Sequence, residues 1–379
     1  FQDGTLYVSV CVCASERDVL PVTMSQSGTR DVRELPVEVD PSNEAQIIDV
    51  ACELVPALNA VDRASMTLSS VSGGITNQLF RVQGGEVTVL LRLFGNKTEL
   101  LIDRCRELKA FLELNAAHLS APLYGCFKNG YAYGYFPGRP LTSEDLCTLS
   151  FVSGIMRTLT AFHSLVPKTL PCPNRSQVFP YVEHLHEEAA KEIPRHAEIQ
   201  ERLPHFSLDK LLSQALRAER DLQLLHPGPV QDSLVFCHND MLPGNLILWD
   251  QDDTINFIDY EYCDWNFPCH DMGNHWCEFT GLDVIVLQFP DHEARQLMVR
   301  EYLTHRNPPK DNSDAEGPTQ EMLDTFEKAS LLSSLVANVQ WCIWCVLQYS
   351  NSTLEFDYLT YLERRLKLQD YILEVIGYT

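Results

Sequence analysis

The first half of the chain carries short apolar and β-branched runs that are typical of strands. The clearest, ValThrValLeuLeuArgLeuPhe at 87–94, contains a single charged residue, Arg92. A pair of glycines at 84–85 lies just before it and predicts a hairpin turn from a preceding strand at 79–82. A further strand is predicted at 131–136. Together these runs predict a small antiparallel sheet in the N-terminal part of the chain.

Apolar positions three to four residues apart predict helices, most of them in the second half of the chain. The run ProGlyArgPro at 137–140 breaks the pattern and predicts a hinge between two lobes. One helix is predicted before this break, at 98–114, with Leu101, Cys105, Leu108 and Leu112 on one face. Beyond the break, helices are predicted at 144–165, 179–192, 207–225, 319–349 and 355–375, and a polar loop at 305–318.

The pattern therefore predicts a two-lobed α+β protein. Residues 1–34 are an N-terminal extension of uncertain structure, residues 35–136 a small lobe built on a sheet, and residues 137–379 a larger, mainly helical lobe. With 379 residues and a hydrophobic fraction of 45%, the chain can bury a substantial core.

Charge narrows the classes of partner. The chain has 52 Asp and Glu against 29 Lys and Arg, which gives a formal net charge of −23. Nucleic acids and anionic lipid surfaces are poor partners for such a chain, because affinity for phosphate groups depends on Lys and Arg. Between Asp221 and Ala294 there is no Lys or Arg, yet this segment holds 14 acidic residues. It is either a solvated acidic face or a site for metal ions and cations.

Cysteine usage indicates a reduced, cytoplasmic protein. The 13 cysteines are scattered and odd in number, which does not suit a disulfide framework. The only CxxC pair, Cys342 and Cys345, lies in an apolar run and is more typical of buried packing thiols than of a zinc site. No run reaches the roughly 18 to 20 uninterrupted apolar residues that predict membrane insertion.

Two carboxylates and an amide have the spacing that phosphoryl transfer requires. In ValPheCysHisAsnAspMetLeuProGlyAsnLeuIleLeuTrpAsp (235–250), Asn245 follows Asp240 by five positions, and Asp259 ends a second apolar run at 254–259. Two strands on either side of the polar residues 250–253 would form a hairpin that brings these three side chains to one end. Phosphoryl transfer uses one carboxylate at the acceptor hydroxyl, and an amide oxygen with a second carboxylate to hold magnesium.

At these residues the chain resembles the choline and ethanolamine kinases, which share the protein-kinase-like fold. The matching strings are CysHisAsnAsp (237–240) with Asn245, IleAspTyrGluTyr (258–262) and AspMetGlyAsnHisTrpCysGluPhe (271–279). The ethanolamine kinases in particular are suggested by strings at 74–77, 94–104 and 352–358. The resemblance, which runs from about Leu35 to the C-terminus, implies ATP-dependent phosphorylation of ethanolamine to phosphoethanolamine, the first step of phosphatidylethanolamine synthesis through CDP-ethanolamine.

The resemblance also implies roles for individual residues. Asp240 would orient the substrate hydroxyl, and Asn245 and Asp259 would bind Mg²⁺. His238 is expected to brace the catalytic loop more than to transfer protons. For the ATP phosphates the resemblance implies Arg92, its ion-pair partner Glu107, and a covering turn of Ser72, Gly73, Gly74, Thr76 and Asn77. Without the resemblance, the pair Gly73 and Gly74 would be interpreted as an ordinary turn, and Arg92 as a residue at the edge of a sheet.

For the substrate ammonium the resemblance implies a site of acidic and aromatic side chains, namely Glu261, Tyr262, Glu278, Trp341, Trp344 and Tyr361. The two tryptophans lie three residues apart in an apolar helix, which by itself favours plain core packing. The stretch after Glu278, PheThrGlyLeuAsp, lacks the aromatic residues that choline kinases tend to carry there. This favours the smaller amine, ethanolamine.

Three alternatives stay open at this point. The first is a choline kinase or a kinase with dual specificity, and the second is an inactive kinase-like binding protein. The third is an aminoglycoside-type phosphotransferase, which shares the first motif but should lack the AspMetGlyAsnHis string. The oligomeric state is also open, with a homodimer as one option.

Overall fold

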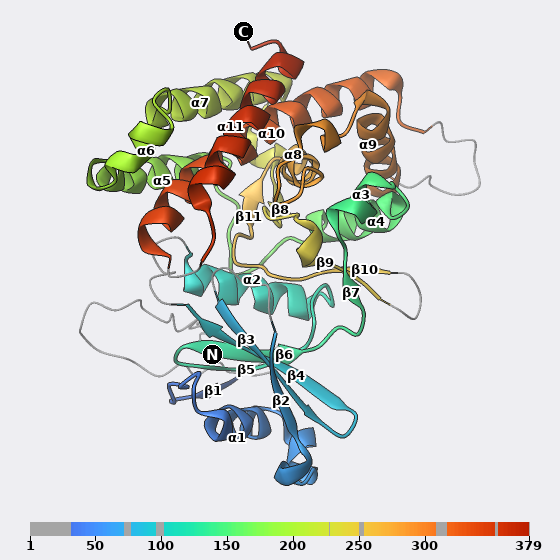
Figure 1. Ribbon diagram of the computed structural model, residues 1–379. Coiled ribbons are helices and arrows are strands. Elements are labelled where there is room, and N and C mark those ends of the chain that lie inside the picture. Colours follow the sequence, from blue (N-terminus) through green and yellow to red (C-terminus); the bar gives the residue numbers. More distant parts are fainter. Residues whose placement is uncertain are drawn as a thin grey trace, which may run out of the picture. The chain divides into compact units, whose positions relative to one another are not determined.

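A six-stranded sheet forms the centre of the N-terminal unit in the computed structural model (Figure 1). The structure describes residues 32–71, 77–95, 102–226, 228–249, 254–307, 317–352 and 355–378, and the chain divides after Pro137 into two compact units. The strand order is β1-β5-β6-β4-β3-β2, with β1 at Arg33–Leu35, β2 at Thr67–Val71, β3 at Asn77–Gly84, β4 at Val87–Phe94, β5 at Leu123–Phe127 and β6 at Gly130–Gly134.

The predicted hairpin is confirmed. Strands β3 and β4 pair antiparallel with Gly84 opposite Val87, and Gly85 takes the left-handed conformation (φ 59°) that a tight turn needs. All neighbouring strands are antiparallel except β1 and β5, which are parallel, so the sheet is not purely antiparallel as predicted. The helix α1 (Glu44–Leu54) packs Ile47, Val50 and Leu54 into one core with Val82 and Leu91 of the sheet.

The helix predicted at 98–114 begins later than its apolar spacing indicates. Helix α2 spans Arg104–Ala116, because the Asp103 side chain accepts hydrogen bonds from the N–H groups of Cys105 and Arg106 and so caps the first turn. The expected face is also wrong. The buried residues are Glu107, Ala110, Phe111 and Leu114, while Cys105, Leu108 and Leu112 are only partly buried and Leu101 lies outside the described residues.

The C-terminal unit is mainly helical, as predicted. Its helices are α3 (Ser143–Cys147), α4 (Val152–His163), α5 (Val178–Glu192), α6 (Ala197–Arg202), α7 (Leu208–Leu225), α8 (Pro268–Glu278), α9 (His292–Arg306), α10 (Gln320–Asn351) and α11 (Tyr358–Ile376). The single helix expected at 144–165 is two helices, α3 and α4, because Leu149 between them takes a left-handed conformation (φ 58°). Short strands pair as β10-β9-β7 and β11-β8, with β7 at Arg139–Pro140, β8 at Val235–Cys237, β9 at Leu246–Leu248, β10 at Ile255–Phe257 and β11 at Asp264–Asn266.

Helix α10 is the central element of this unit and packs against α8, α11, α5, α7 and α9. By length and composition it is the one described helix that could cross a bilayer, but its apolar window is entirely buried in the protein. Helix α8 approaches α10 closely at Gly273, where a Cβ atom would lie 2.5 Å from the backbone oxygen of Ser330 and from the backbone nitrogen of Ser334. Cys342 and Cys345 are fully buried in α10 as free thiols. The predicted packing role therefore suits them.

Candidate active site

The loop after strand β8 carries Asp240, and the helix α8 holds its backbone in place. Asp271 accepts hydrogen bonds from the N–H groups of His238 (2.8 Å to Oδ2) and Asn239 (2.6 Å to Oδ1). One turn further along α8, Asn274 Oδ1 accepts from the N–H of Met241 at 2.6 Å. Every residue of α8 is buried. The polar side chains of Asp271 and Asn274 are therefore hydrogen-bonded to the backbone of the loop and not to solvent.

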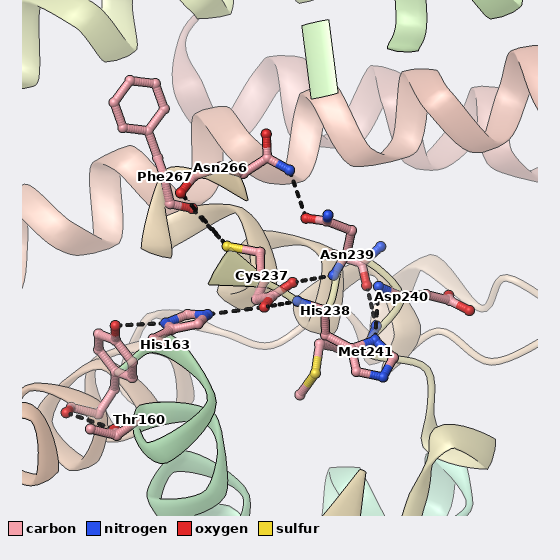
Figure 2. Close-up of polar contacts among 12 residues, drawn as sticks. Thr160, His163, Cys237, His238, Asn239, Asp240, Met241, Asn266 and Phe267 are labelled. Carbon is pink, nitrogen blue, oxygen red and sulfur yellow. Dashed lines mark hydrogen bonds and ion pairs between the residues drawn. The ribbon is translucent and has the colours of Figure 1, made fainter. Parts of the chain in front are cut away.

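The same loop is held from its other side by Asn239 and Asn266. Asn239 takes a left-handed conformation (φ 66°), which Asn tolerates better than most residues. Figure 2 shows its side chain facing that of Asn266, whose Nδ2 donates to Asn239 Oδ1 at 2.7 Å. Asn239 Nδ2 in turn donates to the carbonyl oxygen of Tyr262 at 2.7 Å. Two buried side-chain networks therefore fix the residues immediately before Asp240.

His238 is fully buried and connects the two segments that carry the candidate metal ligands. Its Nε2 lies 2.9 Å from the carbonyl oxygen of Ile258, and its Nδ1 accepts from the N–H of Asp240 at 3.3 Å. The proton must therefore be on Nε2. Burial lowers the pKa of His238, so the ring stays neutral near pH 7. A neutral ring with both nitrogens engaged suits a brace better than a proton carrier.

The predicted hairpin that joins Asn245 to Asp259 is present. Strands β9 and β10 pair antiparallel, and the N–H of Ile258 donates to the carbonyl oxygen of Asn245 at 3.0 Å. Asn245 Nδ2 donates to both the carbonyl oxygen (2.9 Å) and Oδ2 (3.0 Å) of Asp240. Asp259 follows in a left-handed conformation (φ 67°). The structure thus brings Asn245 against Asp240, as the spacing predicts.

Asp240 is a buried acid among other acids. Burial raises the pKa of Asp240 well above its ordinary value, and the charges of Asp259, Glu278 and Glu261 raise it further. Its Oδ1 atom is buried and has no hydrogen-bond partner among the residues that the structure describes. An orphaned carboxylate oxygen in a cluster of carboxylates, with Asn245 bound to the same carboxylate through its amide nitrogen, is a set of hard oxygen donors that suits a divalent cation. These residues therefore fit a metal ion.

An aromatic cluster lies beside these acids. Tyr262 contacts Trp341 edge to face, with ring centroids 5.4 Å apart, and Trp341 contacts Trp344 in the same way at 5.6 Å. Tyr181 of α5 adds a further edge contact to Tyr262 at 6.2 Å, and the nearby charges of Glu261 and Asp240 join burial in raising the pKa of Tyr181. The rings come from three separate parts of the chain and converge on the acids.

Two further predicted residues, Glu278 and Tyr361, are joined by a cation that the sequence pattern does not reveal. Arg365 Nη2 donates to Glu278 Oε1 at 2.8 Å, and Arg365 Nε donates to the Tyr361 hydroxyl at 2.9 Å. Tyr361 also contacts Phe356, with ring centroids 5.5 Å apart. The amine subsite implied by the resemblance therefore contains a buried positive charge as well as carboxylates.

In the N-terminal unit, Arg92 and Glu107 lie 3.9 Å apart, and both side chains are buried. Glu107 has two nearer partners, because Arg104 Nη1 donates to it at 2.7 Å and the Tyr131 hydroxyl at 2.6 Å. Arg104 also donates to Asn77 Oδ1 at 2.9 Å. The other residues of the expected phosphate turn, Ser72, Gly73, Gly74 and Thr76, lie outside the described residues.

Several residues of these networks were not singled out from the sequence, although a signal existed for some. Asp271 and Asn274 stand in the AspMetGlyAsnHis string, which marks the resemblance but does not reveal what they hold. His275 of the same string lies 3.0 Å, through Nδ1, from the carbonyl oxygen of Met241. Arg104 ends the 94–104 string, and its pairing with Glu107 is a three-residue spacing within α2. Arg365 carries no such signal, because Glu278 and Asn338 lie on other helices.

Comparisons with known proteins show the family to which the chain is similar. The choline/ethanolamine kinase family model matches residues 68–370. The chain is 30% identical to the probable ethanolamine kinase A of Dictyostelium discoideum over 345 residues, which cover 89% of this chain and 94% of that protein. It is 30% identical to ethanolamine kinase 1 of Mus musculus over 352 residues, which cover 88% and 92% of the two chains.

Solved structures show the same fold. An ethanolamine kinase of Plasmodium vivax superimposes with a TM-score of 0.71 at 22% identity, over 86% of this chain and 89% of the other. A choline kinase of Cryptosporidium parvum has the same TM-score and identity, over 88% and 96%. The α+β, protein-kinase-like fold that the resemblance implied is thereby confirmed.

Proposed function

The chain belongs to the choline/ethanolamine kinase family, and we propose that it transfers the γ-phosphoryl group of ATP to the hydroxyl of ethanolamine. The observation that carries this proposal is the position of Asp240. Its Oδ1 atom, which has no hydrogen-bond partner among the described residues, lies among further acids, close to rings that suit an ammonium group. The strings that resemble those of the ethanolamine kinases, and the relatives named ethanolamine kinase, favour ethanolamine as the acceptor.

In this proposal Asp240 accepts a hydrogen bond from the ethanolamine hydroxyl and orients its oxygen toward the γ-phosphorus. The bond from this oxygen to phosphorus forms as the bond from phosphorus to the β,γ-bridging oxygen breaks, and ADP leaves. The hydroxyl proton passes to Asp240 late in the transfer.

The side chains around Asp240 would position it and its metal. The Asn245 amide oxygen and the Asp259 carboxylate are proposed to hold Mg²⁺, which would offset negative charge on the phosphates. Asn245 Nδ2, already bound to Asp240, leaves Oδ1 for the metal. His238 is proposed to brace the loop. In the N-terminal unit, Arg92 is proposed to contact the ATP phosphates, with Glu107 holding its guanidinium.

The amine is proposed to bind between acids and rings. A primary ammonium can donate three hydrogen bonds, whereas the quaternary nitrogen of choline can donate none and depends on aromatic faces. Glu261 and Glu278 would accept from ethanolamine, and Tyr262, Trp341 and Trp344 would cover it. Because the aromatic cluster also suits a quaternary amine, choline is the second candidate acceptor.

The test is to incubate a panel of amino alcohols with the protein, ATP and Mg²⁺. Transfer is measured as ADP released, and the product is identified by phosphorus NMR. We expect kcat/KM to be highest with ethanolamine, and we expect Asp240→Ala to abolish transfer while the protein stays folded. Faster turnover of choline would replace ethanolamine by the second candidate. No transfer to any amine would leave the inactive binding protein as the better description. A cytoplasmic location and a homodimer stay predictions, for cell fractionation and light scattering to check.

A further inference from the structure

Arg365 is a fully buried cation. Its side chain contacts Glu278 and Tyr361 of the proposed amine subsite, and Asn338 of α10. It lies on α11 and is 1% exposed. A buried charge is tolerated only when it is paired and hydrogen-bonded, and here Glu278 supplies the opposite charge at 2.8 Å. Burial would lower the pKa of Arg365, but the charge of Glu278 outweighs it and the pKa is raised. The guanidinium is therefore permanently charged.

The guanidinium is fixed by partners at both of its ends. Its Nε and Nη2 both donate to the Tyr361 hydroxyl oxygen, and its Nη1 lies 3.5 Å from Asn338 Oδ1. Asn338 Nδ2 donates to the Arg365 carbonyl oxygen at 2.9 Å and to Gln369 at 2.8 Å. A planar fork held in this way can move little without breaking several buried hydrogen bonds.

This arrangement decides which acceptor atoms remain for an amine. Oε1 of Glu278 accepts the hydrogen bond from Arg365, and Oε2 lies outside that bond. The Tyr361 oxygen already receives two N–H groups, so it is saturated as an acceptor. Glu278 therefore presents one carboxylate oxygen, and Tyr361 presents its ring.

The charge of Arg365 has a second effect. It cancels most of the attraction that Glu278 would exert on any cation. What Glu278 retains is a directed acceptor, Oε2, which a primary ammonium can use and a quaternary ammonium cannot. Without Arg365, Glu278 would be an unpaired carboxylate that attracts every amine alike.

We propose that Arg365 is the positioning residue that gives the amine subsite its preference for a primary ammonium, by holding Glu278 through one oxygen and cancelling its charge. This inference rests on the proposed function, because it assumes that the site takes an amino alcohol. Arg365 is proposed to act through Glu278 and Tyr361 and not to touch the substrate.

The experiment measures kcat and KM for ethanolamine, N-methylethanolamine, N,N-dimethylethanolamine and choline, together with KM for ATP. Arg365→Lys keeps the charge but cannot hold Glu278 and Tyr361 with one fork, and Arg365→Gln removes the charge. For both variants we expect KM for ethanolamine to rise about ten-fold or more, the size expected when a charge-assisted hydrogen bond is lost. For Arg365→Lys, which keeps the charge, we expect KM for choline to change less than about two-fold, since choline cannot use that bond. For Arg365→Gln we expect KM for choline to fall, because the charge of Glu278 is then unpaired.

Two further variants keep the test decisive. Tyr361→Phe removes a single oxygen, so it should fold even if Arg365→Gln does not, and it should shift the preference in the same direction by a smaller factor. Arg364→Lys is the matched control, because Arg364 is the exposed neighbour that pairs with Asp283 at 2.7 Å. It should leave all five KM values unchanged.

A purely structural Arg365 would give a different pattern. Its variants would then lower kcat for all four amines by one common factor and leave their relative KM values unchanged, and this result would overturn the inference. An unchanged preference in Tyr361→Phe would also overturn it. If the parent protein phosphorylates none of the amines, the proposed function itself fails. If the parent prefers ethanolamine and the variants keep the same ratio of kcat/KM between ethanolamine and choline, only the role of Arg365 fails.

Discussion

Asp271 offers a direct measure of how strongly α8 holds the loop that carries Asp240. Its two oxygens accept three hydrogen bonds: Oδ1 from the N–H of Asn239, and Oδ2 from the N–H of His238 and from His163 Nε2 at 3.0 Å. Asn has the same shape but offers one acceptor oxygen and one NH₂ group. In the Asp271→Asn variant at least one buried N–H must therefore face another donor.

The expected loss follows from these contacts. A buried donor left without a partner costs about 1–3 kcal/mol. The bonds that survive lose the charge that makes them roughly twice as strong as neutral ones. We expect the variant to lose about 2–4 kcal/mol of unfolding free energy, which combines one buried donor without a partner and weaker remaining bonds. A loop displaced by about 1 Å would also lower kcat by about 100-fold.

Urea denaturation and steady-state turnover of ethanolamine measure the two effects. The matched control is Asp283→Asn, because Asp283 forms an exposed ion pair with Arg364. An exposed pair contributes at most about 1 kcal/mol, so the control should retain stability and turnover. If Asp271→Asn were as stable and as active as Asp283→Asn, the three hydrogen bonds would not be what holds the loop.

The pH dependence of stability gives a second check on Asp271. Burial alone would raise its pKa, but the hydrogen bond and charge of His163 and the contacts of His238 outweigh burial and lower the pKa. A lowered pKa in the folded state contributes stability at pH values above the unfolded pKa, about 3.9, and this contribution is lost as pH falls through the folded value. The difference between parent and Asp271→Asn should therefore shrink below about pH 4. A constant difference from pH 7 to pH 3 would contradict this account.

Three further predictions follow from the structure. Asp240→Asn should abolish turnover, yet in metal-free buffer it should melt no lower than the parent, because it removes one of several buried carboxylates that repel one another; a clear fall in melting temperature would refute this. Gly273→Ala should lose about 1–3 kcal/mol of unfolding free energy in urea, since the new Cβ would collide with the α10 backbone, whereas Gly317→Ala, with nothing within 4 Å, should lose none. Glu107→Gln should raise KM for ATP and leave KM for ethanolamine unchanged, because Glu107 is proposed to hold Arg92, 3.9 Å away, and is not one of the residues of the proposed amine subsite; equal changes in both constants would argue against it.

Local patterns predicted most of the elements. The strands at 79–82 and 87–94 were predicted from short apolar and β-branched runs, and the long terminal helices from apolar positions three to four residues apart. Helix α8 was missed. All 11 of its residues are buried, the polar ones included, so polar positions do not mark an exposed face. Asp271 and Asn274 are buried because they accept hydrogen bonds from the backbone of the loop. The spacing of residues along the chain does not reveal such contacts.

Helix boundaries depended on single side chains. The start of α2 at Arg104 is set by the Asp103 cap, and the break between α3 and α4 is set by the left-handed Leu149. Neither the Asp103 cap nor the Leu149 conformation changes the spacing of apolar residues. The prediction from spacing therefore started α2 about two turns too early and joined α3 and α4 into one helix. The buried face of α2 also differs from its apolar face, because Glu107 is buried by its bonds to Arg104 and Tyr131.

The sequence by itself determined the candidate chemistry wherever the residues lie close along the chain. Asp240, Asn245 and Asp259 occupy one β-hairpin and its flanks, so their spacing already constrains how they can meet. The pairing of Arg365 with Glu278 spans 87 residues. Such a pairing depends on how α11 and α8 pack against α10, which is a property of the assembled core. Only the tertiary structure could decide this pairing. The spacing of apolar residues along one helix does not reveal which charged side chain of another helix will lie opposite a given position.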